Sequence, residues 1–157
     1  MGVTVTTIRP MSLADLDEVV ALESASQPRP WSEGIFRDEL SAENRVYVIA
    51  EDDRLVGFGG IMVLEDEAHV TNLLVAADRR GRGTGRRMMV SLIESAIDAG
   101  ARHLTLEVRK ENMAARALYA GLGLAPVGIR PDYFGDDDAL ILWAHDIDDP
   151  RYLEGLR

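Results

Sequence analysis

The spacing of apolar residues predicts one strand and two helices in the first quarter of the chain. Residues 3–9 alternate and are rich in valine and threonine, which indicates a first strand. Ser12, with Asp15 three residues later, is typical of a helix N-cap, and Ser32 is placed to cap a second, short helix after two prolines. The apolar stripes of the two predicted helices are Leu13, Leu16, Val19, Val20 and Leu22, and then Ile35, Phe36 and Leu40.

The rest of the chain alternates between strand-like and helix-like segments. Period-two and β-branched runs predict strands, and apolar residues at helical spacing, ended by Gly100 or Gly123, predict helices. The predicted strands are 46–51, 55–64, 69–75, 103–108, 125–129 and 139–145, and the predicted helices are 83–99 and 112–122. We therefore expect an α/β fold in a single domain, with a mixed central sheet of about seven strands and four helices. This domain covers residues 1–147, and residues 148–157 are expected to be a polar C-terminal tail.

Composition narrows the class of protein. The chain has 157 residues, 46% of them hydrophobic, which suffices for one domain with its own core. It lacks a signal-peptide pattern and an apolar run of the ~20 residues that a membrane span needs, so we expect a cytoplasmic protein that does not bind membranes. With no cysteine, it has no disulfide, no thiolate metal site and no acyl-cysteine intermediate. The net charge of −10 argues against nucleic-acid binding.

The charge is unevenly distributed along the chain. Residues 12–43 carry eight acids against two arginines, and residues 132–154 carry eight acids against one arginine. Residues 79–87 carry five arginines and no acid. The acidic segments either attract a basic substrate or only keep the surface soluble, whereas the basic segment suits an anionic ligand.

The basic segment has the features of a phosphate-binding loop. Gly81, Gly83 and Gly85 let the backbone turn tightly and approach a ligand, and the N-terminus of the following helix favours an anion. The P-loop pattern does not fit, because the chain's single lysine lies elsewhere, and neither does the dinucleotide fingerprint G-x-G-x-x-G. What fits is Arg80-x-x-Gly83-x-Gly85, which resembles the cofactor loop of the GCN5-related N-acetyltransferases (GNAT).

A carboxylate and a tyrosine are the candidates for proton transfer. Glu107 ends a hydrophobic strand, and Tyr119 lies on the next helix, on the same face as Asn112 seven residues before it. Each also has a structural alternative: Glu107 as a surface ion pair with Arg109 or Arg116, Tyr119 as a core aromatic, and Asn112 as only a helix cap. The histidines, at positions 69, 103 and 145, lie singly on strands without ligand spacing, so we interpret them as structural and expect no metal site.

Further motifs extend the resemblance over about residues 5–145, and the predicted element order is also that of the GNAT fold. Leu-Glu-Val-Arg at 106–109, Ala117-Leu118-Tyr119 and Gly121-Leu122-Gly123-Leu124 resemble the C-terminal half of the RimI-type enzymes within that family. Three other segments are also similar to segments of the RimI-type enzymes: Pro30-Trp31-Ser32-Glu33, Thr71-Asn72-Leu73-Leu74-Val75 and Tyr133-Phe134. The chain differs in a short loop after Tyr133 and in Phe134, where the family often has a tyrosine.

The resemblance implies a function and a role for each matching residue. RimI-type enzymes transfer acetyl directly from acetyl-CoA to the N-terminal alanine of a small-subunit ribosomal protein. Glu107 matches their general base and Tyr119 their general acid. The positions that match the acetyl-CoA site are Leu73, Leu74, Val75, Arg80, Gly81, Arg82, Gly83, Thr84, Gly85, Arg86 and Asn112. Trp31 and Tyr133 are the aromatic residues that we expect near a basic peptide N-terminus, which would enter between the early helices and the last hairpin.

Two other functions stay open from the sequence. One keeps the fold and replaces the acceptor by a lysine side chain or a small-molecule amine, which the same base would serve. The other is a non-catalytic acyl-CoA-binding module, which the presence of both Glu107 and Tyr119 disfavours.

Overall fold

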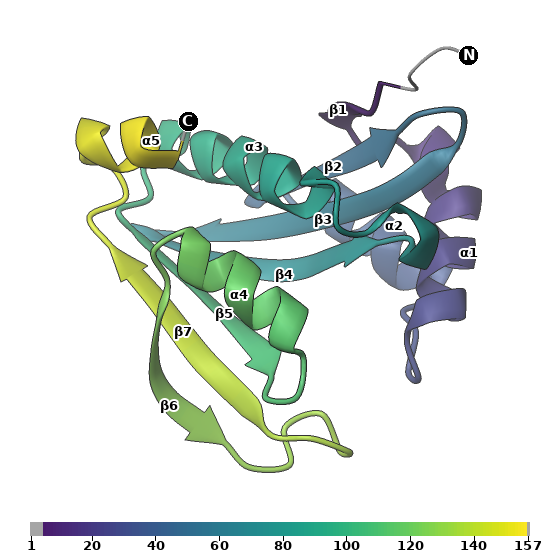
Figure 1. Ribbon diagram of the computed structural model, residues 1–157. Coiled ribbons are helices and arrows are strands. Elements are labelled where there is room, and N and C mark those ends of the chain that lie inside the picture. The colour runs from purple at the N-terminus through teal and green to yellow at the C-terminus, as the bar shows by residue number, and fades with distance from the viewer. Residues whose placement is uncertain (1–4, 157) are drawn as a thin grey trace. The chain divides into compact units, whose positions relative to one another are not determined.

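The computed structural model describes residues 5–156, which form seven strands, five α-helices and two 3-10 turns (Figure 1). The strands are β1 (Thr7–Pro10), β2 (Arg45–Glu51), β3 (Leu55–Leu64), β4 (Glu67–Val75), β5 (His103–Arg109), β6 (Ala125–Arg130) and β7 (Ala139–His145). The helices are α1 (Leu16–Ser26), α2 (Glu33–Ser41), α3 (Thr84–Asp98), α4 (Met113–Gly121) and α5 (Pro150–Leu156), with 3-10 turns η1 (Leu13–Asp15) and η2 (Ala77–Arg79). Val3 and Thr4, in the predicted first strand, lie outside the described residues.

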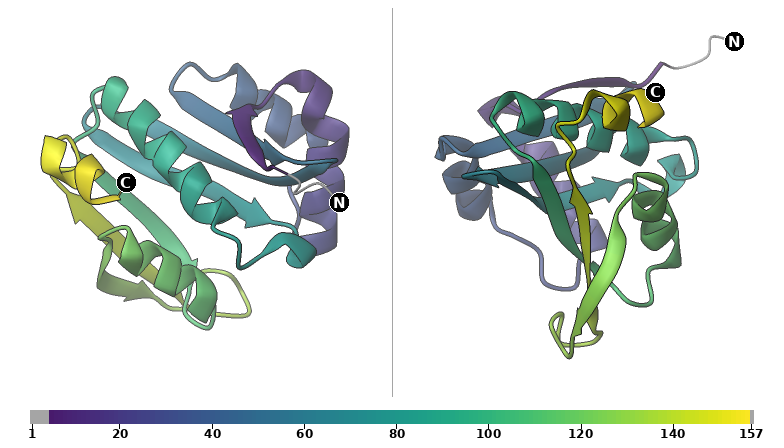
Figure 2. Two further views of the ribbon diagram at one scale, coloured as in Figure 1. Left: turned by 45° about the horizontal axis from the view of Figure 1, so that its top comes forward. Right: turned by 90° about the vertical axis from the view of Figure 1, so that its left-hand side faces the viewer.

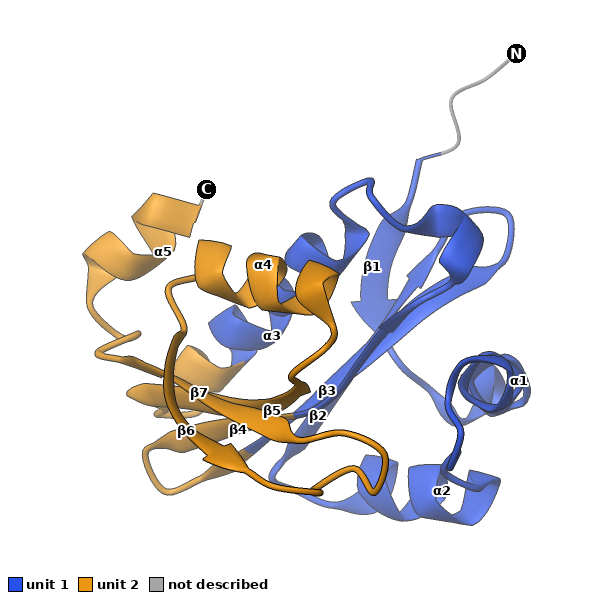
Figure 3. Cartoon of the chain, turned by 60° about the horizontal axis from the view of Figure 1, so that its bottom comes forward, with its two compact units in different colours: residues 1–62, 71–95 blue, residues 63–70, 96–157 orange. Residues whose placement is uncertain are grey.

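The predicted mixed sheet is confirmed. Its strand order is β1-β2-β3-β4-β5-β7-β6. Strand β4 pairs in parallel with β5, at 67–69 against 103–105, while β1 with β2, β2 with β3, β5 with β7 and β6 with β7 pair in antiparallel. The chain divides into two compact units, one of residues 1–62 and 71–95 and the other of residues 63–70 and 96–157 (Figure 3). We call them unit 1 and unit 2 and describe each by itself.

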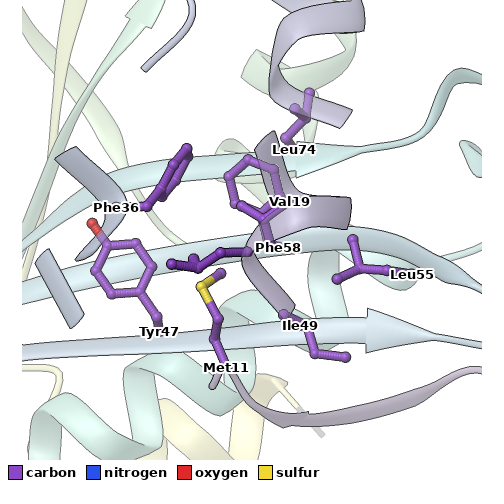
Figure 4. Close-up of a cluster of buried hydrophobic side chains, with 9 residues drawn as sticks. Met11, Val19, Phe36, Tyr47, Ile49, Leu55, Phe58 and Leu74 are labelled. Atoms are coloured by element: carbon purple, nitrogen blue, oxygen red, sulfur yellow. The ribbon is translucent and has the colours of Figure 1, made fainter. Parts of the chain in front are cut away.

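Unit 1 has its apolar core where α1 and α2 meet the strands. Phe36 on α2 and Phe58 on β3 are fully buried, with ring centroids 5.6 Å apart in an edge-to-face arrangement. Around them the cluster consists of Met11, Leu16, Val19, Tyr47, Ile49, Leu55 and Leu74 (Figure 4). Helix α3 packs against β3 through Met88, whose Cε atom lies 3.0 Å from the place where a Cβ on Gly57 would stand. This packing fixes the start of α3, where the glycine loop ends.

Unit 2 contains the first part of β4, the strands β5, β7 and β6 with α4 lying along them, and α5 at its end (Figure 2). Burial alternates along β5: Leu104, Leu106 and Val108 are buried, while the residues between them are half-buried. This period-two pattern gives β5 one buried apolar face and one half-buried face, which we call the open face. Glu107 belongs to the open face.

Two details differ from the sequence-based expectations: the structure of the last residues and the exposure of two residues predicted to be buried. The last residues are not only a polar tail, because they form α5, and the Tyr152 hydroxyl donates to the Leu122 carbonyl at 2.6 Å. Leu13 and Ile35, predicted to face the core, are 57% and 43% exposed, whereas the nearby Leu16 and Phe36 are buried. Among the described residues, no helix is long and apolar enough to cross a membrane.

Candidate active site

The glycine loop in unit 1 joins β4 to α3 and has the backbone of an anion-binding turn. Gly81 and Gly83 have φ values of +77° and +81°, which L-residues with a side chain rarely adopt. A Cβ added to either glycine would meet no protein atom within 4 Å, so both face open space. Helix α3 begins directly afterwards at Thr84, and its first unpaired N–H groups suit a phosphate. Gly85 lies inside this first turn.

The arginines of the loop are not equivalent, and their combined charge is smaller than the sequence suggested. Arg79 donates to Asp52 at 2.9 Å and to Asp78 at 2.9 Å, so these acids largely neutralise it. Arg80 donates from Nε to the Val75 carbonyl at 3.0 Å, which ties the loop back to β4. Arg82 is exposed and makes no hydrogen bond or ion pair with the residues that the structure describes. Arg82 is therefore available to an incoming anion.

The end of β4 offers main chain rather than side chains. Leu74 is buried in the core of unit 1, and Leu73 and Val75 on either side are half-buried. The next residue, Ala76, donates its N–H to the Val56 carbonyl at 2.7 Å. Because the side chain of Leu74 packs into the core, the segment from Leu73 to Val75 offers a ligand its backbone N–H and C=O groups.

Tyr47, a buried residue that the sequence analysis missed, holds the two residues of β4 that precede Leu73. The Tyr47 hydroxyl lies 2.9 Å from Glu39 Oε1, 3.0 Å from Thr71 Oγ1 and 3.2 Å from Asn72 Oδ1, and burial raises its pKa. Tyr47 reaches β4 across β3, where its partner in the ladder is Gly60. A Cβ on Gly60 would lie 2.2 Å from the Tyr47 ring, so only glycine fits. The signal in the sequence was a tyrosine that pairs with a glycine on the neighbouring strand. It can be recognised only when the register of β2 and β3 is known.

Trp31, a predicted substrate residue, is half-buried in unit 1. Its ring lies 5.4 Å from that of Phe36, and its main-chain N–H donates to Glu23 Oε2 at 3.0 Å. Glu23 is only 4% exposed, and burial raises the pKa of its carboxyl group. The position of Trp31 is thus fixed by the core, while its contact with a peptide stays a prediction.

Glu107, the predicted base, lies in unit 2, and its partner is a histidine, not one of the two arginines considered from the sequence. Its Oε2 atom is 2.6 Å from Nε2 of His69. Arg109 instead pairs with Asp136 and lies 4.6 Å above the Phe134 ring, and Arg116 donates to the Lys110 carbonyl. The Glu107 side chain is 12% exposed, so it is mostly buried but still accessible to a substrate. The alternative interpretation of Glu107, as a surface ion pair with Arg109 or Arg116, is therefore wrong.

The expectation that the histidines lie singly is also wrong. His69 contacts Glu107, and the Nδ1 atoms of His103 and His145 lie 3.0 Å apart across the β5–β7 ladder. These pairs arise from strand register, which residue spacing along one strand does not reveal. Among the described residues, no group of three histidines and acids is placed to hold a metal ion.

Tyr119 and Asn112 lie on α4 as predicted. Tyr119 is 7% exposed, and burial raises the pKa of its phenol to about 12, so it is protonated at neutral pH. Its hydroxyl has no hydrogen-bond partner among the described residues, unlike the hydroxyl of a tyrosine fixed in a core network. Asn112 caps α4 by accepting from the Ala115 N–H at 3.1 Å. Its structural role is thus confirmed, and a contact with the cofactor stays a prediction.

The hairpin loop between β6 and β7 carries the other predicted substrate residue. Tyr133 is 48% exposed, and its ring lies 4.9 Å from that of Phe134. Because Arg109 holds both Phe134 and Asp136, the loop is tied to the end of β5, two residues beyond Glu107. Tyr133 therefore projects from a loop whose base is fixed.

Comparison with known proteins places the chain in a family. The sequence model of the Acetyltransferase (GNAT) family matches residues 16–124. The chain belongs to this family. A ribosomal protein bS18-alanine N-acetyltransferase from Salmonella typhimurium is 35% identical over 140 residues, covering 87% of this chain and 95% of that protein. The crystal structure of the ribosomal-protein-S18-alanine N-acetyltransferase from Escherichia coli superposes with a TM-score of 0.81 at 31% identity, covering 90% of this chain and 94% of that one. The predicted GNAT fold is thus confirmed.

Proposed function

We propose that this protein transfers the acetyl group of acetyl-CoA to the α-amine of a protein N-terminus, with the N-terminal alanine of a small-subunit ribosomal protein as the acceptor. The observation that carries the proposal is the carboxylate of Glu107, which is sheltered and pairs with no arginine that the structure describes. The relatives named as bS18-alanine N-acetyltransferases support the choice of acceptor. A cytoplasmic location is part of the same proposal.

The residues of the glycine loop fit the phosphates of acetyl-CoA. The left-handed glycines leave open space where a pyrophosphate would approach, and the first N–H groups of α3 and the exposed Arg82 supply donors and positive charge. The main chain of Leu73–Val75 would hold the pantetheine arm. Acetyl-CoA supplies the activated acetyl thioester. Arg80, Thr84, Arg86 and Asn112 complete the proposed cofactor set.

The proton chemistry follows from two side chains of unit 2. An α-amine has a pKa of ~7.7–8.0, so much of the acceptor arrives as an ammonium ion that cannot act as a nucleophile. Glu107 would accept a proton from this ammonium group, directly or through water. Tyr119, whose phenol is neutral at pH 7, would donate its proton to the departing thiolate. Trp31 and Tyr133 are proposed to contact the first residues of the acceptor.

Steady-state kinetics on a peptide panel test this proposal. The peptides begin with alanine, serine, methionine or proline, continue with the same arginine-rich sequence, and are matched by one alanine peptide with a blocked N-terminus. We expect the free alanine peptide to have the highest kcat/KM and the blocked one to be inert. Opposite-charge steering should lower kcat/KM as ionic strength rises. Equal rates for the free and blocked peptides when both carry a lysine would favour the alternative acceptor, a lysine side chain.

A further inference from the structure

His69 holds the proposed base by a short contact that the mechanism above does not use. Its Nε2 atom lies 2.6 Å from Glu107 Oε2, and its side chain is 32% exposed against 12% for Glu107. The histidine is therefore the more solvent-accessible member of the pair.

The sheet places the two residues together within unit 2. In the parallel pairing of β4 with β5, His69 lies opposite Thr105. Glu107 follows Thr105 by two positions, so it lies on the same open face of β5. The pair thus depends on the register of two strands and not on a mobile loop.

The neighbouring charged groups are engaged elsewhere. Arg109, two positions along β5 on the same face, pairs with Asp136. His103, on the same face before Thr105, contacts His145, and its Nε2 atom lies 3.8 Å from Asp66. Among the described residues, His69 is therefore the ionisable side chain that bonds Glu107, and Glu67 is the other acid on this face of β4.

We propose that His69 accepts from Glu107 the proton that acetylation releases. This inference rests on the proposed function and adds a residue that acts through Glu107. Acetylation of an ammonium group removes two protons from nitrogen: one replaces the proton that Tyr119 gives to the sulfur of CoA, and one must leave the site. Glu107 takes the second proton and becomes a neutral acid. It then passes this proton to Nε2 of a neutral His69 imidazole that carries its own proton on Nδ1, which restores the carboxylate and leaves an imidazolium. The imidazolium releases the proton to water.

The exposure of the two side chains gives the transfer its direction. A protonated Glu107 with 12% exposure has limited access to water, and a carboxyl group that keeps its proton is no base for the next turnover. The His69 ring is open to solvent over about a third of its surface and returns the proton to bulk water.

Substitution at position 69, with chemical rescue, tests the relay. His69→Gln offers Glu107 an N–H donor but no base, and His69→Ala leaves space for added imidazole. We expect both variants to keep the acetyl-CoA affinity of wild type and to lose roughly 10- to 100-fold in kcat, at or below the lower end of the range for groups that act on the substrate directly. Imidazole in the buffer should restore His69→Ala, more so with the more basic substituted imidazoles. His103→Ala, a half-buried histidine on the same face, should keep wild-type kcat.

The outcomes separate the relay from other roles. Full activity of His69→Gln, or a His69→Ala defect that imidazole leaves unchanged, would overturn the relay and reduce His69 to a hydrogen-bond donor. The assay uses whichever amine the wild-type enzyme acetylates. If the peptide α-amine is not a substrate but lysine or a small amine is, the proposed acceptor fails while the His69 test still gives its own answer.

Discussion

The glycine loop of unit 1 and the open face of β5 in unit 2 differ in how the chain builds them. The loop is contiguous: its two left-handed glycines and its arginines lie within residues 79–87. The pair on β4 and β5 joins His69 and Glu107 across 38 residues of sequence. The first is a property of local backbone, and the second exists only once two strands are in register.

The two regions also differ in how they meet solvent. Arg82 in the loop is exposed, so its attraction for an anion is long-ranged but screened by salt. Glu107 is mostly covered, and its interactions persist at higher ionic strength. We infer a division of labour, with affinity for acetyl-CoA in the loop and proton transfer in unit 2. A substitution in one region should therefore leave the function of the other region unchanged.

Glu107→Gln should have the largest effect. It keeps the size of the side chain and removes its basicity, so we expect kcat to fall by about 10²- to 10⁴-fold, the usual range for a general base. Calorimetry should show an acetyl-CoA affinity close to that of wild type. A kcat within twofold of wild type, measured where chemistry is rate-limiting, would remove Glu107 from the reaction.

Tyr119→Phe should come next. The variant loses only the hydroxyl, which has no partner among the described residues, so the fold should be retained and kcat should fall by at least about tenfold through loss of a proton donor. Single-turnover measurements would locate the defect in the chemical step. An unchanged single-turnover rate would return Tyr119 to a packing role.

The same variant has a second expected effect, on stability at alkaline pH. Burial raises the pKa of Tyr119 to about 12, above the value of about 10 for an unfolded chain. Below pH ~10 the phenol is neutral in both the folded and the unfolded chain, so it does not make stability depend on pH. Between pH ~10 and ~12 the unfolded chain loses the proton and the folded chain keeps it, so the free energy of unfolding falls as the pH rises. Over this window the unfolding free energy of Tyr119→Phe should fall less steeply, by up to ~1.4 kcal/mol per pH unit. Denaturant titrations at several pH values would measure it, and parallel slopes would contradict the prediction.

Gly83→Ala should weaken the cofactor site alone. The positive φ costs an alanine about 1–2 kcal/mol, and the added Cβ enters the open space proposed for the pyrophosphate. We expect acetyl-CoA to bind roughly tenfold more weakly, or ~1.4 kcal/mol. Gly100→Ala is the matched control, since Gly100 also has a positive φ of +99° and open space around its Cβ position. Similar losses of affinity in both variants would mean that the effect is general strain.

Arg82→Ala should have the smallest effect, a loss of a few-fold in acetyl-CoA affinity that disappears at high salt. Arg79→Ala is the comparison, because Asp52 and Asp78 already hold Arg79. It should change stability more than affinity. The reverse result, with Arg79 dominating affinity, would show that the ion pairs of Arg79 open when the cofactor binds.

Sequence patterns predicted what is local, and they missed what depends on register. The caps at Ser32 and Asn112, the helix after the glycine loop and the strand around Glu107 follow from neighbouring residues. The His69–Glu107 contact could not be predicted, because spacing on β5 alone does not reveal what β4 places beside it. Helix α5 was missed because residues 150–156 lack a long apolar stripe.

The most direct test of the account is the position of the acetyl group on a peptide that offers two amines. An alanine-initiated, arginine-rich peptide with one internal lysine is incubated with the enzyme and acetyl-CoA, and tandem mass spectrometry locates the product. The account predicts acetylation of the α-amine of alanine in wild type, and loss of this product in Glu107→Gln. Acetyl groups found only on the lysine side chain would contradict the proposed function.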